Sequence, residues 1–247
     1  FQGLTFDELK LNDDYRAQMF RYTNSFKEAR FLRAYFYFNL VRAYGDVPYF
    51  TEMVTTDQVN SLTRTPAQEI FNAIIAECDK LSTELPADYT KLGLDGIAPA
   101  ENGRVTCYAA LALKARAALY AASPLFNPEN NKDLWRRAAE ANKEVIETCT
   151  ANGFKLSKYS ELWGPNNWSN NEMIFVRRYN GNISTLEEYN FPMGVPGGNS
   201  GNCPTQNMVD AYEMKATGKM WNETGSGYDA SNPYAGRDPR FDMTIVK

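Results

Sequence analysis

Apolar residues recur at every third or fourth position from Ala29 to Tyr44, which is the period of an α-helix. One apolar row contains Ala29, Leu32, Phe36, Leu40 and Ala43, and a second row beside it contains Phe31, Tyr35, Phe38 and Val41. A helix that is apolar on most sides must be covered by other helices. We therefore predict a core helix in which Phe36 and Leu40 are nearly inaccessible to solvent. Gly45 and Pro48 predict its end.

Three more stretches keep the helical period and predict amphipathic helices. They run from Thr65 to Leu85, from Arg104 to Ala122 and from Asp133 to Thr150. Thr65, Pro66 and Gln68 fit a helix start that is closed by a capping box. The alanines of the second stretch favour close approach in a helical hairpin. A weaker pattern before Asn24 predicts one further helix, with a break near Asn12 to Asp14.

The composition changes after Gly153, where Asn, Gly, Pro and aromatic residues become frequent. Within this part, Glu172 to Arg178 favours a short strand, Pro204 to Met214 a short helix, and the last residues a strand. The stretch from Asn180 to Cys203 is rich in glycine and predicts a long irregular segment. We therefore expect two parts, a helical part over residues 1–153 and a loop-rich part over residues 154–247.

The composition of the 247 residues excludes several classes of function. No histidine is present, which removes histidine-based acid–base chemistry and histidine-containing zinc sites. The net charge is −4 and no basic cluster occurs, so nucleic acid is not expected as a partner. The four cysteines are too far apart in sequence for a zinc or redox motif, although a disulfide between two of them remains open. No metal or cofactor is expected.

Catalytic residues are not indicated either. Ser123 and Ser200 do not lie in a nucleophile motif, and no histidine is present to activate them. Glycoside hydrolysis needs two carboxylates across one bond, but the pairs Asp13-Asp14 and Glu187-Glu188 are adjacent and point in different directions. We therefore expect a binding protein rather than an enzyme.

Aromatic rings and amides in the loop-rich part are the candidate ligand contacts. Flat rings can cover the apolar faces of sugars, and amides can both donate to and accept from hydroxyl groups. The candidates are Trp163, Asn167, Trp168, Tyr189, Phe191, Asn199 and Asn202. For Trp163, packing of a loop on the helices is the favoured alternative, and for Trp168 stacking and packing both remain open.

Several segments resemble the SusD/RagB family. EARFLRAYFYFNLVRAYGDVP is similar to its hallmark helix, and GRVT followed by an alanine-rich run is similar to the continuation. PTQNMVDAYEM and RDPRF resemble later segments in the same order. The resemblance implies a mainly α fold of tetratricopeptide-like helical hairpins with a loop-rich, irregular second part. Because family members are longer, we expect an incomplete SusD-like fold that lacks the signal peptide, the lipidated cysteine and a C-terminal portion.

The resemblance also implies a function. Members are lipid-anchored proteins on the extracellular face of the outer membrane. They capture glycans and pass them to a SusC-like TonB-dependent transporter. Three alternatives stay open: a binder of peptides or other nutrients as in the RagB branch, a helical-repeat interaction scaffold, and an all-helical glycoside hydrolase. Glycan contacts in the family come from variable loops, so no contact residue carries over by position.

Overall fold

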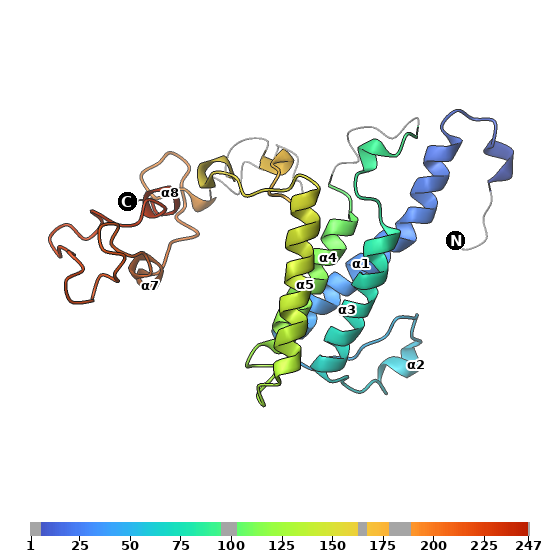
Figure 1. The fold of residues 1–247 in the computed structure, drawn as a ribbon, viewed down its shortest axis with the longest axis horizontal. Coiled ribbons are helices and arrows are strands. Elements are labelled where there is room, and N and C mark those ends of the chain that lie inside the picture. The colour runs from blue at the N-terminus through green and yellow to red at the C-terminus, as the bar shows by residue number, and fades with distance from the viewer. Residues whose placement is uncertain (1–5, 95–102, 163–166, 178–188, 247) are drawn as a thin grey trace. The chain divides into compact units, whose positions relative to one another are not determined.

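The computed structural model describes residues 6–94, 103–162, 167–177 and 189–246, with only the backbone of Trp168. Two compact units form, residues 1–177 and residues 178–247, and each is described by itself. The first unit contains α1 (Tyr15–Tyr44), α2 (Thr56–Val59), α3 (Ala67–Glu84), α4 (Cys107–Ala122) and α5 (Lys132–Ala151) (Figure 1). Short 3-10 turns occupy Asp7–Leu9, Tyr89–Lys91, Tyr159–Leu162 and Asn167–Ser169. No strand occurs within these described ranges, and the mainly helical fold class is confirmed.

Helix α1 begins at Tyr15, well before the predicted Ala29, and runs without interruption through the most apolar stretch. The expected break near Asn12 to Asp14 precedes its first turn. The helix ends at Gly45, whose amide donates to the Val41 carbonyl at 2.8 Å. Gly45 has φ 70° and ψ −126°, a conformation that a residue with a Cβ atom rarely adopts, so glycine at this position specifies the end of the helix.

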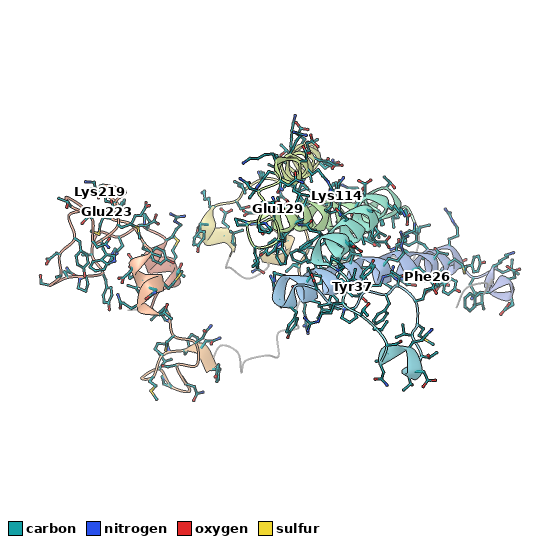
Figure 2. The ribbon with its side chains drawn as sticks, turned by 90° about the horizontal axis from the view of Figure 1, so that it is seen from below. Phe26, Tyr37, Lys114, Glu129, Lys219 and Glu223 are labelled. Atoms are coloured by element: carbon teal, nitrogen blue, oxygen red, sulfur yellow. The ribbon has the colours of Figure 1, made fainter. Side chains whose placement is uncertain are left out.

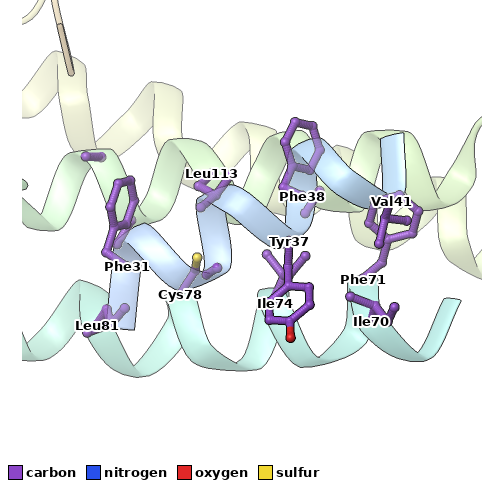
Figure 3. Packing of buried hydrophobic residues seen from close by; sticks show 14 of the residues in the cluster. Phe31, Tyr37, Phe38, Val41, Ile70, Phe71, Ile74, Cys78, Leu81 and Leu113 are labelled. Atoms are coloured by element: carbon purple, nitrogen blue, oxygen red, sulfur yellow. The ribbon is translucent and has the colours of Figure 1, made fainter. Parts of the chain in front are cut away.

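The buried side of α1 includes Phe31, Phe38 and Val41 of the second apolar row but not Tyr35, which is exposed, and the expectation that Phe36 and Leu40 are inaccessible is wrong. Phe36 is 59% exposed and Leu40 is also exposed, whereas Phe38 is 1% exposed. Within the described residues, α1 packs against α3 and α4, and Figure 3 shows Phe31, Phe38 and Val41 directed into this contact. Because α1 is apolar on nearly all sides, its period does not indicate which side the neighbouring helices cover.

Helices α3, α4 and α5 pack side by side as two successive antiparallel hairpins (Figure 1). The main core lies between α1, α3 and α4, where the largest buried side chains are Phe31, Phe38, Phe71, Ile70, Ile74 and Leu81 (Figure 3). Alanines form the contact between α4 and α5: Ala115, Ala118, Ala122, Ala138 and Ala141. Small side chains allow the two helices to approach closely, as the alanine content predicts. Among the described residues, no helix is long and apolar enough to cross a membrane.

The start of α3 differs from the predicted capping box. The residue before its first turn is Pro66, and the amide of Ala67 donates to the Asp46 carboxylate at 2.8 Å. The Gln68 side chain does not cap the helix but donates to the carbonyl oxygens of Ala121 and Phe126, at 2.7 and 2.8 Å. Partners distant in sequence thus replace the local cap.

Two charged groups join the helices around the core. Lys114 of α4 reaches Glu144 of α5 at 2.8 Å and also pairs with Asp79 of α3, and it is labelled in Figure 2. Glu28 of α1 accepts from Nε of Arg104 at 2.9 Å, just before α4 begins. Each pair satisfies a charge that lies largely out of solvent, and so fixes the relative positions of the helices.

Residues 154–162 and 167–177 belong to the helical unit. The rings of Phe154 and Tyr108 meet edge to face, with their centroids 4.9 Å apart. The rings of Phe175 and Phe31 meet in the same way, with their centroids 5.4 Å apart. The units therefore separate at residues 177/178, later than the composition change at Gly153. The strand expected over Glu172 to Arg178 is absent at residues 172–177, while Arg178 lies outside the described residues. Side-chain contacts with the helices take the place of strand pairing here.

Within its described residues, 189–246, the second unit contains the short helices α7 (Gln206–Asp210) and α8 (Phe241–Thr244) and a small core of Val209, Phe241 and Ile245. The helix predicted from Pro204 contains α7, but the strand expected at the chain end is absent at residues 245 and 246, which follow α8, while Lys247 lies outside the described residues. Arg237 is buried, and its guanidinium donates to the carbonyl oxygens of Tyr212 and Pro233 at 2.9 and 3.0 Å. It therefore ties two distant turns together.

Candidate functional site

The segment from Tyr189 to Cys203, which we call the aromatic loop, folds back on itself. The amide of Gly201 donates to the Tyr189 carbonyl at 2.7 Å, and the amide of Ser200 donates to the Phe191 carbonyl at 2.8 Å. The Ser200 hydroxyl accepts from the amide of Met193 at 2.7 Å. These bonds hold the two limbs of the loop together, so its side chains are presented from a defined backbone.

Alternate residues of the first limb expose apolar side chains. Tyr189 is 57% exposed, Phe191 is 45% exposed and Met193 is 79% exposed, and Val195 is also exposed. Tyr189 and Asn190 are helical and residues 191–197 form bends and turns, so the four side chains are exposed from one short segment without the alternation of a strand. Exposed apolar residues that gather on one segment, rather than being scattered singly, indicate a surface used for binding.

Gly201 allows the Tyr189 ring to lie against the backbone. A Cβ atom added to Gly201 would lie 2.0 Å from Cε1 of Tyr189, a distance that real contacts never reach. The ring therefore occupies the space that any other residue would fill, and the opposite limb supports it. A supported ring loses less freedom when a ligand stacks on it than a freely rotating ring does.

The aromatic loop contains no acidic or basic residue, and its remaining polar groups are amides and a few small side chains. Asn199 and Asn202 are exposed, and the Asn199 amide makes only a local bond to the Gly197 carbonyl at 3.3 Å. The Cys203 thiol donates to the Ser200 carbonyl at 3.2 Å. Rings and amides without charge suit a neutral ligand that has both apolar faces and hydroxyl groups.

The seven candidates predicted from the sequence divide between the two units. Tyr189, Phe191, Asn199 and Asn202 all lie on the aromatic loop of the second unit. Asn167 belongs to the helical unit, where its side chain donates to the Leu162 carbonyl at 3.0 Å. Trp163 and the Trp168 side chain lie outside the described residues, so their role stays a prediction.

Sequence reasoning missed three residues of the aromatic loop. Met193 and Val195 extend the exposed row, and Gly201 supports the Tyr189 ring. The apolar residues at 189, 191, 193 and 195 are visible in the sequence, although the segment forms turns rather than the strand that such a pattern predicts. The contact at Gly201 depends on the folding back of the loop, which the local pattern does not reveal. In the part of the chain that the structure describes, no group of acidic and cysteine side chains could hold a metal ion.

These features define a helical scaffold of tetratricopeptide-like hairpins with an attached loop-rich unit. Residues 5–119 match the family model described as SusD-like, starch-binding associating with outer membrane, and residues 166–247 match that of the SusD family. The chain belongs to the SusD/RagB family. The hallmark helix identified in the sequence is the middle and end of α1, and PTQNMVDAYEM includes α7.

Relatives and solved structures agree with this assignment. SusD-like protein P25 of Formosa agariphila is 25% identical over 236 residues, which cover 87% of this chain and 40% of that protein. A SusD-like carbohydrate-binding protein from Bacteroides fragilis superposes with a TM-score of 0.67 at 28% identity, covering 87% of this chain and 39% of the other. A second SusD-like protein from that organism superposes with a TM-score of 0.62 at 27% identity, covering 87% of this chain and 41% of the other. The chain thus spans about two fifths of the length of these relatives.

Proposed function

We propose that the protein binds glycans and that the aromatic loop contributes to the binding surface. The observation that carries this proposal is the row of exposed Tyr189 and Phe191 beside Asn199 and Asn202 on a loop without charge. A structural relative from Bacteroides fragilis is described as carbohydrate-binding, which supports the same ligand class. Stacking rings with few amide contacts give weak affinity, and a millimolar dissociation constant needs only about 4 kcal/mol.

The proposal extends to the place of action and the partner. We infer that the whole protein is lipid-anchored at the extracellular face of the outer membrane and delivers its ligand to a SusC-like TonB-dependent transporter. One matched family model carries the description of starch-binding in association with the outer membrane, which supports this location. Binding is expected without hydrolysis, because the chain has no histidine and its adjacent carboxylates do not form a catalytic pair.

A peptide ligand is the second candidate, as in the RagB branch. It is favoured by Met193 and Val195, whose exposed aliphatic side chains suit apolar peptide side chains better than sugar rings. Glycan and peptide panels tested on the same protein separate the two candidates. Release of reducing ends from a polysaccharide in the same panel would instead indicate a hydrolase.

The test is calorimetric titration of the full-length protein with the polysaccharide that binds best in such a panel. Tyr189→Ala should weaken binding by about 1–3 kcal/mol, by analogy with the stacking of bases on aromatic side chains. Gly201→Ala should weaken it similarly, because the added methyl group displaces the Tyr189 ring without removing it. Trp168→Ala is expected to weaken binding while leaving the melting temperature nearly unchanged.

Tyr44→Ala is the matched control, because Tyr44 is a tyrosine still more exposed than Tyr189 and ends α1 in the other unit. It should leave binding unchanged. If Tyr189→Ala and Gly201→Ala both bind as the parent does, the aromatic loop is not part of the ligand surface. A large loss of melting temperature with unchanged binding in Trp168→Ala would identify Trp168 as a packing residue.

A further inference from the structure

Cys107 and Cys149 continue the faces through which α4 and α5 pack together. On α4, residues spaced three or four apart make one row: Cys107, Leu111, Ala115, Ala118 and Ala122. On α5 the corresponding row is Leu134, Ala138, Ala141, Val145 and Cys149. The alanines of both rows form the buried contact between these helices. Cys149 therefore lies on the side of α5 that faces α4, and Cys107, which also packs against the main core, lies at the edge of the corresponding side of α4.

The register of the two helices brings both cysteines to the same end. The Asn142 side chain donates to the Ala115 carbonyl at 3.4 Å, and Lys114 pairs with Glu144 at 2.8 Å, which fixes the antiparallel alignment. Two turns from Ala115 towards the start of α4 lead to Cys107. Two turns from Asn142 towards the end of α5 lead to Cys149. Both steps cover about 10–12 Å at 1.5 Å per residue, so the two cysteines lie at one level.

The surroundings of both thiols are closed and well anchored. Cys149 is buried and Cys107 is half-buried. The amide of Cys107 donates to the Pro86 carbonyl at 3.1 Å, and the Cys149 carbonyl accepts from the amide of Phe154 at 3.0 Å. Burial raises the pKa of both thiols, and for Cys149 the charge of Cys107 is the next cause, as expected for neighbours. A disulfide needs Cα atoms about 4.4–6.8 Å apart, and an alanine interface allows this close approach.

We propose that Cys107 and Cys149 form a disulfide bond that joins the start of α4 to the end of α5 when the protein meets a disulfide oxidant. All four cysteines are free in the structure. With oxidised glutathione, the more accessible Cys107 thiolate attacks and releases one glutathione thiolate, which leaves a mixed disulfide. The Cys149 thiolate then attacks Sγ of Cys107 and releases the second glutathione. The two cysteines lose two protons and two electrons, and one glutathione disulfide becomes two thiols.

The remaining cysteines do not compete for this bond. Cys78 lies on α3 with no exposed surface, and burial raises the pKa of its thiol to about 12, so it stays protonated and unreactive. Cys203 is exposed, so oxidised glutathione can cap its thiol as a mixed disulfide. The proposed bond closes the open end of the α4–α5 hairpin, from which the segment after Gly153 departs. The bond would therefore hold in place the end of α5, where the segment after Gly153 begins.

The experiment exposes the full-length protein to oxidised glutathione, then alkylates the remaining thiols under denaturing conditions and maps the digested peptides by mass spectrometry. We expect an alkylated thiol on Cys78, an alkylated or glutathione-linked Cys203, and one linked pair of peptides that contain Cys107 and Cys149. Oxidation should raise the melting temperature by about 5–10 °C, because the bond closes a loop of roughly 40 residues in the unfolded chain. Reduction with dithiothreitol should reverse the shift.

Cys203→Ala is the matched control and should keep both the linked peptides and the shift. Cys149→Ala should lose both, and its thiols should not link any other pair of peptides. Four alkylated thiols after oxidation would overturn the proposal, as would a link between peptides that involves Cys78 or Cys203. If Cys149→Ala fails to fold, the peptide map of the parent protein still decides the question.

Discussion

Truncation of Phe38 to alanine should destabilise the helical unit, while the same truncation at Phe36 should have little effect. The two phenylalanines lie two residues apart on α1 and differ in exposure, 1% against 59%. They therefore provide a comparison in which residue type, helix and change in helix propensity are the same. Only the burial of the side chain differs.

The contacts of Phe38 set the size of the expected effect. Its ring meets the Tyr120 ring of α4 edge to face, with the ring centroids 5.1 Å apart, and the centroid of the Phe71 ring of α3 lies 6.4 Å away. Removal of a buried phenylalanine ring leaves a cavity and costs about 3–5 kcal/mol. Among the described residues, the Phe36 ring meets only the Tyr35 ring on the same helix, with the ring centroids 6.1 Å apart. Its truncation should change stability by less than about 1 kcal/mol.

The assay is urea unfolding of both variants and the parent, followed by far-ultraviolet circular dichroism. This signal reports mainly on α1, α3, α4 and α5. Phe38→Ala should lower the urea concentration at the midpoint of unfolding, while the dependence of the unfolding free energy on urea stays unchanged. Its melting temperature should fall by about 10 °C. Equal losses in the two variants would refute the assignment of the buried side of α1. A larger loss for Phe36→Ala would show that the other side of the helix is covered in solution.

Two further predictions concern polar groups of the same unit. The hydrogen bond from Arg30 at 2.7 Å holds the pKa of Glu77 below its usual value, so its stabilising effect is present above about pH 4.5 and is lost as the pH falls. In thermal melts, Glu77→Gln should therefore destabilise the protein more at pH 7 than at pH 3, and equal losses would contradict this cause. Asn127 joins the end of α4 to the start of α5 through three hydrogen bonds of 2.8–3.2 Å, so Asn127→Ala should cost about 2–3 kcal/mol in urea unfolding. The exposed Asn72→Ala is its control, and similar losses in both would show that Asn127 is not a structural link.

The sequence by itself determined the helical elements, because their signals are local. The three- to four-residue period indicated the main helices, and Gly45 indicated where α1 ends. The aromatic and amide content of the aromatic loop was also readable, since it depends only on composition. The family resemblance placed these elements in order along the chain, which the comparisons confirmed.

Only the tertiary structure decided which surfaces these elements use. The buried side of α1 depends on where α3 and α4 pack, and both apolar rows of α1 satisfy the same period. Asp46 caps α3 and Gln68 binds the end of α4 because the chain folds back, so a local motif could not identify these partners. The support of Tyr189 by Gly201 and the common level of Cys107 and Cys149 likewise arise from contacts between residues distant in sequence. Such contacts are set by packing, for which the free energy depends on shape and register rather than on the type of each residue alone.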